Sequence, residues 1–199
     1  MATDKHPREE VTLVLIKPDG VKRGLIGEII KRLEQRGLKI IALAMEEPNK
    51  EKIDGHYPKN KEWITRLGNK TLATYEKYKV SSKKRHGTSD PYKIGMQVRK
   101  WLIDYMASGP IVKMVVKGIH AIDMVRKLCG HTLPNMAEMG TIRGDYSVDS
   151  PAAANSAKRA VHNIIHASET PEEAEHEIAY WFSPEEIHEY KRAEEDTMF

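Results

Sequence analysis

Cysteine is nearly absent from this sequence, and long apolar runs are absent altogether. Cys129 is the single cysteine among 199 residues, which excludes an intrachain disulfide and any zinc site built from several thiolates. The longest apolar run, residues 40–45, is far too short to span a bilayer, and the polar first ten residues lack the apolar stretch of a secretory signal. These absences predict a cytoplasmic protein without a membrane segment.

Several common motifs for phosphate and metal binding are also missing. The sequence has no GxxxxGK[ST] phosphate loop, no HExxH pair and no EF-hand loop. Gly24 and Gly27 lie near the start of a predicted helix, but glycines that serve the entry into the helix explain them at least as well as a phosphate cradle does. We therefore expect no metal site formed by the protein itself.

The composition that remains is that of a folded protein with an uneven distribution of charge. Hydrophobic residues make up 40% and charged residues 31%, and the length suits one domain or one domain with a sizeable insertion. The net charge of +3 hides two opposed segments. Residues 59–100 hold 12 Lys and Arg against 3 Asp and Glu, net +9, whereas residues 169–199 hold 2 against 11, net −9.

Apolar β-branched segments alternate with amphipathic ones along the chain, which predicts alternating strands and helices. Strands are expected over Val11–Lys17, Leu38–Glu46, Ile111–Val116 and Val161–His166. Helices are expected over about Val21–Arg36, Gly95–Met106, Ile119–Cys129 and Pro171–Phe182, with a short helix over Ala152–Ala160 and another that begins after Ser183. The stretch Asn60–Lys93 combines glycines, serines and a Lys-Lys-Arg run, which predicts an irregular basic segment that includes one or two short helices.

The order of these elements predicts an α+β fold with an antiparallel, ferredoxin-like sheet that is backed by helices. Residues 1–199 form one domain in this prediction. It carries a basic insertion at about 60–94 and an extended loop at about 146–161, before the strand that contains His166.

The nine histidines are dispersed, and His162 and His166 are the only close pair in a regular element. On a helix this spacing would place both rings on one face as metal ligands. Ile164 and Ile165 between them favour a strand instead, and no third ligand is evident. A lone histidine near a strand end is more often structural than nucleophilic, so the motifs around it decide its interpretation.

Those motifs resemble a nucleoside diphosphate kinase over nearly the whole chain and in the order of that family. The matching segments are Thr12–Val21 (TLVLIKPDGV), His56-Tyr57, Ser108–Val112 (SGPIV), Arg126 with Gly130 and Thr132–Pro134, Gly140–Asp145 (GTIRGD), Asn163–Ser168 (NIIHAS), Glu172–Ile178 and Trp181-Phe182. The resemblance implies transfer of the γ-phosphate of a nucleoside triphosphate to a nucleoside diphosphate, which maintains the NTP and dNTP pools. It also implies a ping-pong mechanism through a phosphohistidine at His166.

The resemblance also implies a role for each matching residue. Glu177 would hydrogen-bond the other ring nitrogen of His166, Ser168 would support Glu177, and Tyr57 would lie beside the catalytic histidine. Phosphate and ribose would be bound by Lys17, Arg126, Thr132, Arg143 and Asn163. The chemistry agrees, because a neutral imidazole is a competent nucleophile and phosphoryl transfer depends on cations placed around the moving phosphate. Mg²⁺ is expected as the cofactor, bound with the nucleotide phosphates rather than by a protein cage.

The sequence departs from the family at three places. Ala167 stands where the family has glycine, which should be tolerated if its φ is not positive. The aromatic residue that stacks on the base falls at Val98 by counting, and Tyr92 or Trp101 fits only with a shifted alignment, so that residue stays unassigned. The basic insertion and the 146–161 loop are both longer than in most relatives.

The expected partners are ATP and other nucleoside di- and triphosphates, and other copies of this chain in a homo-oligomer, most simply a hexamer. The basic insertion is expected to be a solvated segment that packs on an acidic neighbour. The net −9 C-terminal region, of the same or another subunit, is one such neighbour. The alternatives are a contact of the insertion with nucleic acid or with an acidic partner, and a reshaped entry to the nucleotide pocket. A contact with nucleic acid would make the protein a nucleotide-sensing or nucleic-acid-binding module on the same fold.

Overall fold

A computed structural model describes residues 9–193 and 195–198 of the chain. Its single sheet has four strands, β1 (Glu9–Ile16), β2 (Lys39–Glu46), β3 (Ile111–Ile119) and β4 (Ile165–Ala167). The strand order is β2-β3-β1-β4, and every neighbouring pair is antiparallel. This is the ferredoxin-like arrangement predicted from the order of elements. No helix in the described part of the chain is long and apolar enough to cross a membrane.

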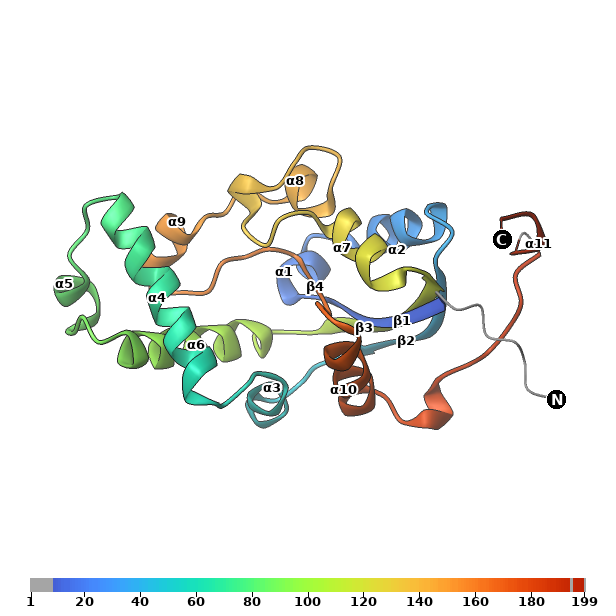
Figure 1. Ribbon diagram of the computed structural model, residues 1–199, viewed down its shortest axis with the longest axis horizontal. Helices are drawn as coiled ribbons and strands as arrows, with labels where there is room; N and C mark the ends of the chain where they lie inside the picture. Colours follow the sequence, from blue (N-terminus) through green and yellow to red (C-terminus); the bar gives the residue numbers. More distant parts are fainter. Residues whose placement is uncertain (1–8, 194, 199) are drawn as a thin grey trace.

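Helices cover both faces of this sheet. They are α1 (Pro18–Lys22), α2 (Ile26–Gln35), α3 (Lys50–His56), α4 (Lys61–Lys77), α5 (Ser82–His86), α6 (Pro91–Met106), α7 (Ala121–Cys129), α8 (Ile142–Tyr146), α9 (Pro151–Ser156), α10 (Pro171–Trp181) and α11 (Glu195–Met198). Short 3₁₀ turns span Pro134–Met136 and Pro184–Glu186. Figure 1 shows α2 and α7 on one side of the sheet, α3 and α10 on the other, and the pair α4 and α6 projecting away from it.

Two apolar cores follow from the alternation of side chains along the strands. Val14 and Ile16 of β1 face the core under α2 and α7, whereas Leu13 and Leu15 face the core under α3, α6 and α10. All four side chains are fully buried. Strand β1 therefore lies in the centre of the sheet with both faces covered, and its C-terminal end leads directly into Lys17.

The predicted helix Val21–Arg36 is in fact two helices, α1 and α2, separated at Arg23–Leu25. Gly24 at φ +69° lies in this break, a backbone angle that glycine adopts without strain. The predicted strand Val161–His166 is also wrong at its start, because Ile164 has φ +70° and strand pairing begins only at Ile165. The short helix predicted over Ala152–Ala160 ends at Ser156.

The irregular basic segment predicted over Asn60–Lys93 is wrong. These residues form α4, α5 and the start of α6, and Asn60, Ser81 and Asp90 cap the three helices with their side chains. Helices α4 and α6 pack at close range through two glycines, one on each helix. A Cβ at Gly68 would lie 1.8 Å from the carbonyl oxygen of Pro91, and one at Gly95 would lie 1.9 Å from that of Ile64.

We expect Gly68→Ala to lower the free energy of unfolding by about 1–3 kcal/mol, because the new methyl group forces α4 and α6 apart. The matched control is Gly27→Ala in α2, where a Cβ meets no atom within 4 Å. That change should raise the free energy by about 0.5–1 kcal/mol through helix propensity. Urea unfolding followed by circular dichroism measures both free energies. Equal stability of the two variants would contradict the close packing of α4 against α6.

The helix predicted after Ser183 is wrong as well, because only the 3₁₀ turn Pro184–Glu186 forms there. The following residues run along the edge strand β2, where the His188 N–H donates to Ile41 O at 2.8 Å and the Tyr190 hydroxyl donates to Ile40 O at 3.0 Å. These tertiary hydrogen bonds override the local helix signal.

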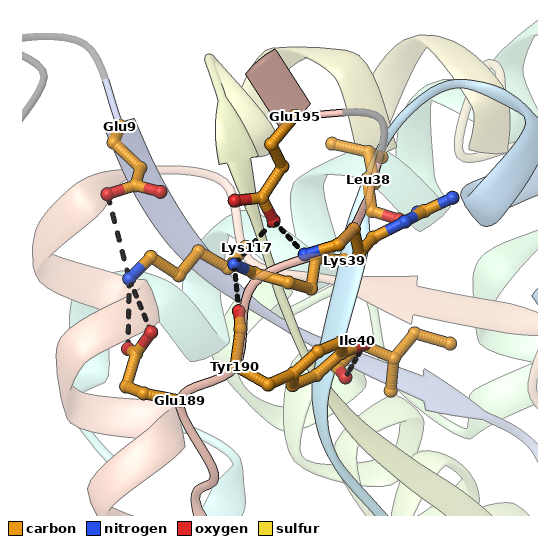
Figure 2. A network of polar contacts seen from close by, with 9 residues as sticks. Glu9, Leu38, Lys39, Ile40, Lys117, Glu189, Tyr190 and Glu195 are labelled. Atoms are coloured by element: carbon orange, nitrogen blue, oxygen red, sulfur yellow. Dashed lines mark hydrogen bonds and ion pairs between the residues drawn. The ribbon is translucent and has the colours of Figure 1, made fainter. Parts of the chain in front are cut away.

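Lysines of the sheet bind this acidic C-terminal segment, as Figure 2 shows. Lys39 Nζ donates to Tyr190 O at 2.6 Å and Glu195 Oε1 at 2.8 Å, and Lys117 Nζ lies 2.9 Å from Glu189. Lys113 Nζ lies 3.4 Å from Glu186. The expectation that the basic insertion packs on the acidic C-terminal region of the same chain is therefore not met. Within the described residues, no ion pair joins 59–100 to 169–198.

Candidate active site

An open pocket of about 370 Å³ lies where β1 ends and β4 begins, beside α7 and α8. Six of the nine predicted site residues line it: Lys17, Arg126, Thr132, Arg143, Asn163 and His166. The other lining residues are Cys129, Gly130, His131, Ile165, Ala167, Glu169 and Glu173. Residues far apart in the sequence thus meet around one cavity, with three cationic side chains and the imidazole of His166 at its wall.

His166 lies on β4 and pairs with Leu15 of β1. Its ring is hydrogen-bonded to the carboxylate of Glu177. His166 Nε2 lies 2.9 Å and 3.0 Å from the two oxygens of Glu177, and Ser168 Oγ donates to Glu177 Oε2 at 2.6 Å. An ionised carboxylate only accepts hydrogen bonds, so the imidazole proton lies on Nε2 and the lone pair lies on Nδ1. Within the described residues no hydrogen bond is formed by His166 Nδ1, so the lone pair of the neutral ring is available at this atom.

Glu177 is held in its charged form. Burial acts to raise the pKa of this carboxyl, but the neighbouring His166 and the hydrogen bonds from His166 and Ser168 outweigh it and leave the pKa below its usual value. An ionised Glu177 both fixes the tautomer of His166 and stabilises positive charge that develops on its ring.

His56 is a site residue to which the sequence assigned no role. Its side chain is 2% exposed, its ring meets that of His166 edge-on at 5.1 Å, and Trp181 Nε1 donates to its Nδ1 at 3.2 Å. Burial and the neighbouring His166 lower the pKa of His56 to about 3, so it is neutral. The motif His56-Tyr57 was its only signal in the sequence.

Tyr57 packs against this inner histidine, with ring centroids 5.0 Å apart, and it does not line the pocket. Burial and the nearby Glu177 raise the pKa of its phenol. The aromatic ring that contacts His166 is thus His56, and Tyr57 lies next to His56.

Ligand atoms of His56, His166 and Glu177 lie within 4.8 Å of one another, a spacing that a metal ion could use. The hydrogen bonds argue against this use, because His56 Nδ1 already accepts from Trp181 and Glu177 already accepts from His166 and Ser168. The group is a hydrogen-bonded network in which Glu177 and His56 surround the ring of His166.

The polar wall of the pocket is held in place by hydrogen bonds to backbone carbonyls. Arg143 donates to Gly130 O and Ile165 O, each at 2.7 Å, and the buried Lys17 donates to Asn163 Oδ1 at 2.7 Å. Asn163 Nδ2 in turn donates to Thr132 O at 2.9 Å. Arg143, Lys17 and Asn163 are therefore fixed before any ligand arrives, which is the condition for electrostatic stabilisation of a transferring phosphate.

Arg126 lies at the more exposed side of the pocket, with Arg126 NH2 3.0 Å from Glu169 Oε1. Both side chains are largely exposed, so this ion pair stabilises the fold little and an incoming phosphate can replace the carboxylate.

The turn before His166 is strained and is held by two residues that the sequence analysis missed. Ile164 adopts φ +70°, and the Ile165 N–H donates to Asn163 O at 2.7 Å across it, which defines a γ-turn. Asp19 Oδ2 accepts from Ile164 N at 3.1 Å, and Asp19 Oδ1 accepts from the Tyr105 hydroxyl at 2.5 Å. A β-branched residue in this conformation persists only when its surroundings enforce it. Asp19 and Tyr105 thus set the backbone from which His166 projects.

Lys17 should make nucleotide binding dependent on pH. Burial, with the charge of Arg143, lowers its pKa from 10.5 to about 8 in the empty pocket. A bound phosphate favours the charged amine and raises this pKa, so binding takes up a proton at pH values above about 8 and affinity falls as the pH rises through this range.

Calorimetric titration with ADP at pH 9, in buffers of different ionisation enthalpy, should show uptake of close to one proton, and at pH 7 almost none through this group. Lys17→Arg is the matched control, because its guanidinium stays charged and takes up no proton. An absence of uptake at pH 9 would show that Lys17 is already charged in the empty pocket.

The structure bears on two of the three departures from the family pattern. Ala167 lies in β4 and is not among the described residues of positive φ, so its methyl group is tolerated, as expected. Tyr92, Val98 and Trp101 are all absent from the lining of the pocket, and Trp101 instead packs against His86 at 5.5 Å. The base-stacking residue stays unassigned.

Comparison with known proteins identifies relatives over most of the chain. A family model described as nucleoside diphosphate kinase matches residues 10–66 and 92–187. The chain is 49% identical over 178 residues to the nucleoside diphosphate kinase of Pyrobaculum aerophilum, covering 89% of this chain and 97% of the relative. It is 40% identical over 184 residues to that of Pyrococcus furiosus, covering 92% and 89%.

Solved structures give the same result. The crystal structure of the Pyrobaculum aerophilum NDP kinase superposes with a TM-score of 0.89 at 47% identity and covers 91% of this chain and 100% of that one. The Borrelia burgdorferi nucleoside diphosphate kinase, in a transition-state mimic with bound vanadate and ADP, superposes with a TM-score of 0.74 at 34% identity and covers 96% of each chain.

Proposed function

The chain belongs to the nucleoside diphosphate kinase family, and we propose that His166 Nδ1 is the atom that carries the phosphate between nucleotides. The activity is transfer of a γ-phosphate from a nucleoside triphosphate to a nucleoside diphosphate. The observation that carries the proposal is the contact between His166 Nε2 and Glu177, which leaves Nδ1 with its lone pair at the wall of the pocket.

In the first half-reaction, the Nδ1 lone pair attacks the γ-phosphorus and the bond from that phosphorus to the β–γ bridging oxygen breaks. The nucleoside diphosphate leaves with the electron pair, and no proton has to move. The phosphorylated ring keeps its Nε2 proton, and Glu177 stabilises its positive charge at 2.9 Å. In the second half-reaction, a terminal phosphate oxygen of another nucleoside diphosphate attacks the same phosphorus and releases His166, which gives ping-pong kinetics.

The cationic wall stabilises the charge that is spread over the moving phosphate. Arg143 is fixed by backbone carbonyls and presents its guanidinium at the cavity, whereas Lys17 acts as a point charge beside Asn163. Thr132 and Asn163 are proposed to bind the remaining phosphate and ribose oxygens, and Arg126 to exchange Glu169 for phosphate. Ser168 supports Glu177, and Tyr57 supports the inner histidine.

Members of the family need a divalent cation, and we propose Mg²⁺. The residues of the pocket fit a cation that arrives on the nucleotide, because its wall has three cationic groups and only Glu169 and Glu173 as carboxylates among the described residues. These two could accept hydrogen bonds from water around the ion. When bound, the ion neutralises phosphate charge.

We also propose one kinase domain over 1–199, a cytoplasmic location and assembly into a homo-oligomer, with the hexamer as the expected form. The support for assembly is the edge strand β2, on which Leu43 and Met45 are 54% and 59% exposed on the same side.

The experiment for the kinase proposal is incubation of the protein with γ-labelled ATP and Mg²⁺, followed by a chase with a second nucleoside diphosphate. We expect an acid-labile, base-stable phosphoprotein with its label on His166, and loss of this label during the chase. Transfer without any labelled protein would contradict the phosphohistidine.

A further inference from the structure

The basic hairpin, defined as residues 59–100, has no role in the reaction described above. It contains α4, α5 and most of α6, all in the described part of the chain, and none of its residues lines the nucleotide pocket. Residues 67–91 within it also fall outside the match to the family model. The kinase activity therefore does not explain why this segment is present or why it has a net charge of +9.

The hairpin is a rigid support rather than a solvated loop. Helices α4 and α6 touch at Gly68 and Gly95, as described above. Across the tip, Tyr75 and His86 share a hydrogen bond of 2.8 Å, and His86 Nδ1 lies 2.7 Å from Gln97 Oε1. Cationic side chains on such a fixed backbone lose less entropy on binding a ligand than those of a flexible segment.

The 146–161 loop packs on this hairpin, so the two long segments of the chain form one lobe. Helix α9 contacts α4, and Arg85 NH2 donates to Ser156 Oγ at 3.3 Å. Asp149 closes this loop at its base by accepting from Arg159 NH2 at 3.0 Å and from His162 N at 2.7 Å.

Most of the positive charge of the basic hairpin is not paired with carboxylates of the described residues. Of its twelve Lys and Arg, only Lys59 and Arg99 form ion pairs within the described residues, both with Asp54. Arg66, Lys70 and Lys77 are exposed at positions i, i+4 and i+11 of α4, which places them in one row along the helix. At 1.5 Å per residue this row is about 16 Å long.

Exposed aromatic rings accompany the cations. Tyr78 is 52% exposed just beyond the end of α4, with Lys77 Nζ 5.7 Å from the centre of its ring, and Tyr92 is 37% exposed with Lys61 Nζ at 6.0 Å. Cations with aromatic faces on a rigid surface are the combination that binds single strands, where phosphates meet the charges and bases stack on the rings.

We propose that the basic hairpin binds single-stranded nucleic acid, with Arg66, Lys70 and Lys77 on its phosphates and Tyr78 stacked on a base. An acidic protein surface would use the cations but would leave the exposed tyrosines without a role. The acidic C-terminal region of a second copy fits less well, because Glu186, Glu189 and Glu195 are already paired with lysines of the sheet.

The test is fluorescence anisotropy of a labelled DNA strand of about 15 nucleotides and mixed sequence against the full chain, between about 50 and 200 mM KCl, with saturating Mg²⁺ and ADP to fill the nucleotide pocket. The test variant combines Arg66→Ala, Lys70→Ala and Lys77→Ala. The matched control combines Lys31→Ala, Arg36→Ala and Lys127→Ala, which removes the same charge from exposed positions on α2, at its C-terminal end and on α7. Kinase activity should be unchanged in both.

We expect the log of the binding constant to fall linearly with the log of salt. The slope should decrease by about 2 in the test variant, because each phosphate that a cation neutralises on a single strand contributes about 0.7 to it. The control variant should keep the slope of the native chain. Tyr78→Ala should weaken binding about tenfold without changing the slope.

Three results would overturn the proposal. An equal decrease of slope in both triple variants would show a response to overall charge alone. Binding of the strand that occurs only when ADP is left out of the titration would place it in the nucleotide pocket. Equally tight, Arg66-dependent binding of a polyglutamate probe would show that the hairpin recognises acidic chains in general.

Discussion

His166→Ala should lower kcat for phosphate transfer by a factor on the order of 10⁵–10⁶, because an enzyme without its covalent nucleophile retains only the effects of binding and electrostatics. Substrate binding should persist, since Lys17 and Arg143 hold their positions through Asn163 and backbone carbonyls rather than through His166. A coupled assay of NTP formation measures the first effect, and calorimetric titration with ADP measures the second.

The matched control for this variant is His176→Ala, which removes an exposed imidazole from α10, the helix that also carries Glu177. It should keep its activity and its labelled phosphoenzyme intermediate. A kcat of His166→Ala within about tenfold of that of the native enzyme would contradict the assignment of His166 as the nucleophile.

Arg143→Ala should lower kcat by about 10²–10³, the cost of removing one preorganised electrostatic donor from a developing negative charge. Its guanidinium is buried, with NH1 bonded to Gly130 O and NH2 to Ile165 O, so the alanine variant also leaves these two carbonyls without a donor. The unfolding temperature of the variant should therefore be measured together with kcat and KM.

A second substitution separates the two roles of Arg143. Arg143→Lys keeps the positive charge but cannot reach both carbonyls with a planar fork, so we expect a rate between those of the native enzyme and the alanine variant. Arg36→Ala, at the exposed end of α2, is the control for loss of one guanidinium. A well-folded Arg143→Ala variant with less than about a tenfold loss of kcat would show that this residue serves the fold alone.

Local sequence was sufficient to predict the position of an element that depends mainly on its own pattern of apolar and polar residues. Strands β1, β2 and β3 and helices α7 and α10 lie close to their predicted positions, because each has a clear apolar period and a capping or breaking residue at its end. The basic hairpin was misjudged because its buried positions include Gly68, Thr71 and Gly95, which a search for apolar periods cannot recognise. These small residues contribute to the fold by allowing α4 and α6 to approach each other closely.

The same contrast holds at the site. The motifs around Lys17, Arg143 and His166 could be identified from the sequence because each segment is distinctive by itself. Asp19, His56 and Tyr105 could not be assigned a role, because each acts only through a partner distant in the sequence. The strained φ of Ile164 is a further example, since no local pattern predicts a β-branched residue there.

The sequence by itself determined the family, the nucleophile to test and the uneven distribution of charge, because these depend on which residues occur and in which order. Only the tertiary structure decided which nitrogen of His166 is free, which charges are neutralised and which remain exposed. The physical reason is that hydrogen bonds and ion pairs depend on distances between atoms. Residues 166 and 177, or 39 and 195, come within hydrogen-bonding distance only when the sheet and its helices have packed.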